Sequence, residues 1–212
     1  KILQIVCGNF DYNHYDLTLY ASRMEEMPLG TYAERLNINY FFDGGNGFIA
    51  KIKNKLKLCV YYHFSPSVYY QLFIREKYDV GIAFIEGYAT RFLSGAPSGM
   101  RKIAWLHTDI ENNHWTWVAF RNKEEERTCY RNFDKIVCVS KIVEESFQKV
   151  FGVTGTMIIH NPIDTEKIIA MSVAEMRYPK MKDIRIVTIG SLIPVKGYDR
   201  LLRVVKRLVE EQ

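Results

Sequence analysis

The segment with the clearest chemical potential lies near the end of the chain, in "VTIGSLIPVKGYDRLLRVVKRLVEE". A strand-like run over 184–190 ends at Gly190, and Ser191 and Lys196-Gly197 precede an amphipathic helix. A glycine lets the backbone approach a ligand closely, and a helix N-terminus beside a lysine attracts anions. The pattern predicts a phosphate-binding loop built from Gly190, Ser191, Lys196 and Gly197. Many α/β proteins carry the same pattern as ordinary structure, so both interpretations stay open here.

A second group of polar side chains follows two strand-like runs in the middle of the chain. Glu86 comes after "YDVGIAF", and His107 ends "KIAWLH", with Asp109 and His114 in the polar loop beyond it. Ligands of open α/β sheets bind at the carboxyl ends of the strands. A neutral imidazole there can bond a ligand hydroxyl or stabilise developing positive charge. Alternatively, His107 caps its strand, and the other three residues belong to solvated turns.

The elements that must position these residues are short apolar runs typical of strands covered on both faces. We expect strands at 1–6, 15–20, 78–84, 102–107, 135–140, 156–161 and 184–190, and another near 36–42. Helical stretches are expected at 66–77, 115–132 and 141–152, the last starting after Ser140 as N-cap and ending at Gly152. Strands that alternate with helices predict an α/β fold with a parallel sheet and right-handed crossovers.

One spacing conflicts with this pattern. Only residues 7–14 separate the first two expected strands, whereas a parallel crossover needs about a dozen residues or more. Either the two strands form a hairpin, or residues are missing between Phe10 and Tyr15. The connecting sequence lacks a two-residue hairpin turn. We therefore favour a missing loop and helix.

Composition narrows the function class. The chain has 212 residues, which suits one large domain, or one domain and part of another. Its net charge of +5 suits either an ordinary surface or an anionic partner. The basic amphipathic segment 48–58 suits either an anionic membrane surface or an ordinary surface helix. No apolar run is long enough to span a bilayer. The scattered cysteines suit a reducing cytosol and show no zinc spacing.

The final segment resembles the start of the second domain of group 1 glycosyltransferases, which are retaining GT-B enzymes. In that family a strand and Gly-Arg-Leu precede Lys-Gly-hydrophobic-Asp and a helix. The residues Lys196, Gly197, Tyr198 and Asp199 match, whereas Ser191 replaces the arginine. The segments "KIAWLHTDI", "FDKIVCVSKIVEESFQKVFGV" and "IIHNPIDTEKI" also resemble the family's first domain. The likeness covers about residues 78–212, and residues 1–77 match only loosely.

The resemblance implies a Rossmann-like GT-B arrangement, with an acceptor-side domain over 1–180 and the start of a donor-binding domain over 184–212. It implies that His107 lies near the transferring sugar, and that Glu86, Asp109 and His114 face the acceptor. Lys196 would contact the donor diphosphate, together with Gly190, Ser191 and Gly197. Ser191 offers a hydrogen bond but no charge, so diphosphate binding is expected either to be weaker or to depend on another cation.

By the same resemblance, the function is retaining transfer of a sugar from a nucleotide-diphosphate sugar to a glycan or lipid-linked acceptor. Bacterial surface polysaccharide or glycolipid synthesis would be the setting, in the cytoplasm or peripherally on the inner face of the membrane. No cofactor, catalytic metal or nucleic-acid partner is expected. The family's paired-glutamate motif lies beyond Gln212, so we expect little activity from this chain alone. The alternative is a non-catalytic α/β module that binds a phosphorylated ligand or a protein. A nicotinamide oxidoreductase is disfavoured because no dinucleotide fingerprint follows a strand.

Overall fold

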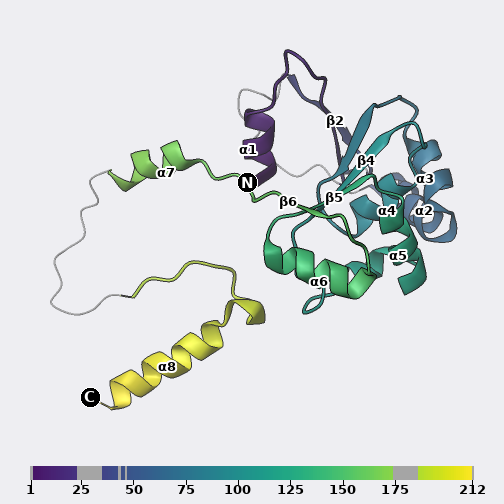
Figure 1. Cartoon of the computed structure of the whole chain (residues 1–212). Helices are drawn as coiled ribbons and strands as arrows, with labels where there is room; N and C mark the ends of the chain where they lie inside the picture. Colours follow the sequence, from purple (N-terminus) through teal and green to yellow (C-terminus); the bar gives the residue numbers. More distant parts are fainter. Residues whose placement is uncertain (1, 23–34, 43, 46, 174–185, 212) are drawn as a thin grey trace. The chain divides into compact units, whose positions relative to one another are not determined.

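The computed structural model describes residues 2–22, 35–42, 44–45, 47–173 and 186–211 (Figure 1). The chain divides into two compact units, Lys1–Thr165 and Glu166–Gln212, and each is treated by itself. The domain boundary predicted between 180 and 184 lies outside the described residues.

The first unit is built on a parallel sheet of four strands in the order β3-β4-β5-β6 (Figure 1). These strands are β3 (Val80–Ala83), β4 (Arg101–Leu106), β5 (Lys135–Cys138) and β6 (Met157–Ile158). Each coincides with a predicted strand. Because the order in the sheet follows the order in the sequence, every crossover moves in one direction and all carboxyl ends meet at one edge. The parallel sheet flanked by helices confirms the predicted α/β class, and it is Rossmann-like.

Six helices connect or flank these strands. They are α2 (Phe48–His63), α3 (Pro66–Phe73), α4 (Tyr88–Ser94), the 3-10 helix η2 (Trp115–Ala119), α5 (Lys123–Arg131) and α6 (Lys141–Phe151). The predicted ends of α6 are confirmed, because the Ser140 side chain accepts from the Val143 N–H and Gly152 adopts the left-handed conformation. The single helix predicted over 115–132 is wrong: it is η2 and α5, interrupted where Asn122 caps α5. Helix α4 was not predicted.

Two apolar clusters hold the first unit together. One packs α5 and α6 against β4 and β5, and its members are Ala104, Leu106, Ile110, Tyr130, Ile136, Cys138, Val143, Phe147 and Phe151. The other packs α3 and α4 against β3, and it contains Tyr70, Ile74, Ala83, Leu93, Ala96 and Met100. At Gly95 the backbone of Pro66 lies so close that an added Cβ would come within 2.1 Å of it. The α3–α4 packing therefore requires glycine there.

Near this sheet, β1 (Thr18–Ala21) and β2 (Asn37–Tyr40) form a separate two-stranded parallel sheet. Aromatic contacts connect it to the main core: the Tyr20 and Tyr78 hydroxyls are 3.1 Å apart, and the Phe41 ring lies 4.6 Å from that of Phe92. The strands predicted at 15–20 and near 36–42 are thus present.

The strand predicted over 1–6 is wrong, since α1 (Ile2–Gly8) is a helix. No described strand pairs with this segment, and a helix satisfies its backbone groups internally where an unpaired strand would not. The argument for missing residues between Phe10 and Tyr15 rested on a parallel crossover. Because residues 2–8 are a helix, no parallel crossover joins them to β1, and nothing in the spacing requires further residues between Phe10 and Tyr15.

The second unit contains most of α7 (Thr165–Ser172), the turn η3 (Pro194–Lys196) and α8 (Tyr198–Glu210). The predicted strand over 184–190 is not formed in its described part, 186–190, where no neighbouring strand pairs with it. The helix predicted after Gly197 is present as α8. Its apolar side chains Leu202, Val204, Leu208 and Val209 are exposed, and Leu201 and Val205 are half-buried. No described helix of either unit has the length and apolar character needed to cross a membrane.

Candidate functional site at the carboxyl edge of the sheet

The carboxyl edge of the main sheet brings together the residues that follow its strands. Backbone bonds continue the ladder past the strand ends: the Val139 N–H donates to Leu106 O at 3.1 Å, and the Ile159 N–H donates to Cys138 O at 3.0 Å. The first residues beyond β4 are therefore held beside those beyond β5. This edge carries His107, Asp109, Ser140 and His160, and Glu86 reaches it from the loop after β3.

Glu86 and His107 are in direct contact. The backbone N–H of His107 donates to the Glu86 carboxylate, with distances of 3.2 Å to Oε1 and 3.3 Å to Oε2. Glu86 is only 1% exposed, and it has no ion pair within the described parts of the chain. A buried carboxylate without a cation is costly, so such groups are concentrated at functional sites. Its side chain faces the end of β4 and is hidden from solvent.

The imidazole of His107 is partly buried beside the Phe84 ring, 5.2 Å away in edge-on geometry. Its Nε2 atom is inaccessible to solvent and has no hydrogen-bond partner among the residues that the structure describes. Most buried polar atoms in proteins have a partner. At the edge where α/β proteins bind ligands, a turn of this partly buried ring would offer Nε2 to a ligand group.

The turn that presents Glu86 requires glycine at the next position. Gly87 has a φ of +83° and precedes α4, and a Cβ added there would come within 3.3 Å of the Trp115 ring. The Trp115 indole N–H in turn donates to the Thr108 hydroxyl at 3.3 Å, next to His107. The loops after β3 and β4 are thus packed against each other through Trp115.

Asp109 shapes the loop beyond His107. Its carboxylate accepts from the backbone N–H of Asn112 at 3.3 Å and from the Asn112 side-chain amide at 2.6 Å. The Asn112 side chain, followed by Ser146, lowers the pKa of Asp109 below its ordinary value. The carboxylate therefore stays ionised and turns the chain back toward α6.

His114 belongs to a different polar group in the same unit. Its Nε2 lies 3.0 Å from the carboxylate of Glu126, which is 1% exposed and also accepts from the Thr116 hydroxyl at 2.5 Å. Burial, followed by the Glu126 and Glu86 carboxylates, raises the pKa of Tyr130 well above its ordinary value. Both buried carboxylates thus lie near one protonated phenol beneath the carboxyl edge of the sheet.

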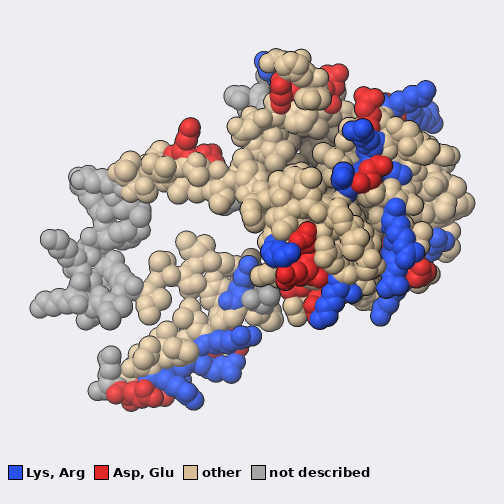
Figure 2. All heavy atoms as spheres, viewed as in Figure 1, with Lys and Arg blue, Asp and Glu red and all other residues tan. Residues whose placement is uncertain are grey.

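The predicted phosphate loop lies in the second unit. Gly197 has a φ of +68° and precedes α8, and Lys196 ends η3 with its side chain in solvent. Gly190 lies against Tyr198, whose hydroxyl would be 2.8 Å from an added Cβ, and Ser191 is exposed. Figure 2 shows basic side chains along α8, which carries Arg200, Arg203, Lys206 and Arg207.

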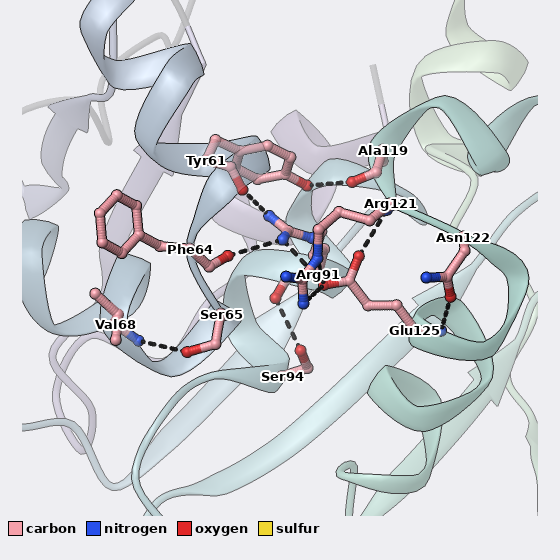
Figure 3. A network of polar contacts seen from close by, with 10 residues as sticks. All are labelled: Tyr61, Phe64, Ser65, Val68, Arg91, Ser94, Ala119, Arg121, Asn122 and Glu125. Atoms are coloured by element: carbon pink, nitrogen blue, oxygen red, sulfur yellow. Dashed lines mark hydrogen bonds and ion pairs between the residues drawn. The ribbon is translucent and has the colours of Figure 1, made fainter.

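Sequence reasoning missed the most buried charge in the unit, Arg91 on α4. Arg91 Nη2 donates to Phe64 O at 3.1 Å and to Glu125 Oε1 at 3.0 Å, and Nη1 donates to the Tyr61 carbonyl (Figure 3). Its guanidinium also lies 4.4 Å from the centre of the Tyr61 ring. These contacts join α2, α4 and α5 behind the site. The only available signal was an arginine within the apolar segment "YATRFLS".

The described residues contain no cluster of three or more potential metal-binding side chains. The edge instead offers imidazole, hydroxyl and carboxylate groups fixed by backbone contacts. Such groups can orient a polyhydroxylated ligand and stabilise charge that develops on it.

The parallel sheet and its flanking helices, with polar side chains at the carboxyl edge, define a Rossmann-like α/β domain. The chain belongs to Glycosyltransferase Family 4, whose family model matches residues 36–167, more than half of its length. Searches of curated proteins and of solved structures gave no significant match. The match covers every strand of the main sheet, together with Glu86, His107, Asp109 and His114.

Proposed function

We propose that this chain takes part in retaining transfer of a sugar from a nucleotide-diphosphate sugar to an acceptor hydroxyl. The observation that carries the proposal is His107, whose buried Nε2 lacks a described partner at the carboxyl edge of the sheet. In the proposed reaction, the bond from the anomeric carbon to the diphosphate breaks, and a bond to the acceptor oxygen forms on the same face. The diphosphate leaves with the electron pair and takes up the proton that the acceptor hydroxyl loses.

In this proposal the partly buried ring of His107 turns to bring Nε2 to the surface, where it contacts the transferring sugar, and Glu86 is a positioning residue. Its burial supports that role, because the carboxylate contacts the His107 amide and is shielded from a ligand in solvent. Asp109 stabilises the loop that would face a glycan or lipid-linked acceptor. His114 would act indirectly, through its bond to Glu126.

The donor diphosphate is proposed to bind at Lys196 and at the N-terminus of α8, where a lysine and the helix dipole favour negative charge. Ser191 and the backbone at Gly190 and Gly197 would complete this contact. No cofactor is proposed, and bacterial surface polysaccharide or glycolipid synthesis is the setting that we propose.

Calorimetric titration of the full chain with UDP-, GDP- and ADP-sugars tests the donor part of the proposal. We expect binding that Lys196→Ala weakens about tenfold or more, because one charge-assisted phosphate contact is lost. Lys206→Ala, which removes a lysine further along α8, should leave affinity unchanged. Equal affinities of the wild type, Lys196→Ala and Lys206→Ala for the donor would overturn the role of Lys196.

The sugar contact of His107 is tested by NMR of its imidazole. Sugar that binds at the edge of the sheet should shift the Nε2 resonance of His107. The corresponding resonance of His63, which is exposed on α2, should not move. Shifts of similar size at both histidines would contradict a site at His107.

A further inference from the structure

Helix α2 exposes a row of large apolar side chains to solvent. Phe48, Ile52 and Leu56 recur every four residues and form one row, and Ile49 lies beside it. Their exposed fractions are 79%, 50% and 63%, with 69% for Ile49. An amphipathic surface helix normally turns such residues toward the core.

The inner face of α2 is fixed by different residues. Ala50 and Tyr61 are the buried positions of the helix, and the Tyr61 hydroxyl donates to Ala119 O at 2.9 Å. The Tyr61 carbonyl accepts from Arg91 (Figure 3). Rotation of α2 to bury its exposed row would break these contacts, so the row faces outward in the folded unit.

The charges on α2 indicate what covers this row. Lys51, Lys53 and Lys55 are exposed around it, and the helix contains no aspartate or glutamate over its 16 residues. Lys57 also belongs to the helix, but it donates to Phe41 O. A second copy of the chain would bring like charges together, because the same face pairs with itself in a two-fold dimer. An anionic lipid surface instead matches both the lysines and the apolar row.

We propose that α2 docks this protein on an anionic membrane surface, with Phe48, Ile49, Ile52 and Leu56 inserted among the lipids. The lysines contact the headgroups. The helix lies in the plane of the interface, because its inner face remains packed on the first unit. This inference is independent of the proposed sugar transfer, so failure of one leaves the other standing.

Sedimentation of the full chain with vesicles tests the proposal. Phosphatidylcholine vesicles containing phosphatidylglycerol should bind the protein, pure phosphatidylcholine vesicles should not, and added salt should weaken binding. Ile52→Glu with Leu56→Glu should weaken binding at least about tenfold, because two inserted side chains are lost. Ile142→Glu with Ile163→Glu, at two exposed apolar positions outside α2, adds the same charge as the matched control and should bind like the wild type.

A second pair of variants separates charge from insertion. Replacing Lys51, Lys53 and Lys55 by glutamine should weaken binding about a hundredfold, at about 1 kcal/mol for each lysine near the surface. The same change at Lys77, Lys123 and Lys135 alters net charge equally and should have little effect. If both triple variants lose binding equally, or if vesicle charge has no effect, the proposal is wrong. A concentration-dependent dimer that Ile52→Glu abolishes, without vesicle binding, would assign the face to a second copy.

Discussion

Glu86 accepts a hydrogen bond from the backbone N–H of His107, and this contact joins the ends of two neighbouring strands. The carboxylate comes from the loop after β3, and the amide belongs to the first residue after β4. Because the bond holds the backbone of His107, it sets the direction in which the imidazole leaves the sheet. The position of the ring therefore depends on a residue that solvent does not reach.

Glu86→Ala should destabilise the first unit by about 1–3 kcal/mol, since a buried N–H loses its acceptor and a cavity forms. Glu86→Gln retains an acceptor oxygen, and it should lose less than about half as much. Chemical denaturation followed by tryptophan fluorescence measures both. The His107 amide proton should move upfield in Glu86→Ala and remain near its original shift in Glu86→Gln. An unchanged amide resonance in Glu86→Ala would show that the bond does not form in solution.

Arg91→Met should cost about 3–5 kcal/mol in the free energy of unfolding, because it leaves the Glu125 carboxylate without its buried partner. The Arg91 side chain is 1% exposed, and two backbone carbonyls would also lose their donor. Arg121→Met is the matched control, since Arg121 pairs with the same carboxylate from a side chain that is 43% exposed. It should cost no more than about 1 kcal/mol. Similar losses in the two variants would contradict a dominant role for Arg91.

Much of the fold was predictable, because buried parallel strands form apolar runs that need no knowledge of their partners. β3, β4 and β5 illustrate this, as does α6, whose two ends are encoded locally by Ser140 and Gly152. The segments 1–6 and 184–190 have equally apolar sequences, yet neither is a strand among the described residues. Strand formation there depends on a neighbouring strand that local sequence does not reveal.

The sequence predicted which strand ends carry the residues of the candidate site, but it did not predict the contacts that these residues make. The position of His107 at the end of an apolar run placed it at the carboxyl edge. Burial of Glu86, and the contact of His114 with Glu126 twelve residues later, depend on how the helices pack against the sheet. Arg91 was missed for the same reason, since its partners come from α2 and α5.

Stability should fall in acid partly through Glu125. Burial raises the pKa of this carboxyl, but hydrogen bonds from Arg91 and then Arg121 outweigh burial and leave the pKa below its ordinary value of 4.5. A pKa that is lower in the folded state gives stability that is complete above about pH 4.5 and is lost as the pH falls through the folded pKa. Denaturation at a series of pH values should therefore show a shallower acid slope in Glu125→Gln. Glu124→Gln, which alters an exposed neighbour, should keep the acid slope of the wild type. A shallower slope in Glu124→Gln, but not in Glu125→Gln, would contradict the role of Glu125.

Gly87→Ala should be more damaging than Gly152→Ala, although both glycines have positive φ values, of +83° and +68°. At Gly152 an added Cβ meets nothing within 4 Å, so only the cost of the left-handed conformation remains, about 1–2 kcal/mol. At Gly87 the Cβ would also press on Trp115 at 3.3 Å, in a turn adjacent to Glu86. We expect a loss of about 3 kcal/mol or more there, together with a shifted His107 amide resonance. Gly152→Ala should leave that resonance in place. Equal destabilisation by the two changes would mean that the Trp115 contact yields without cost.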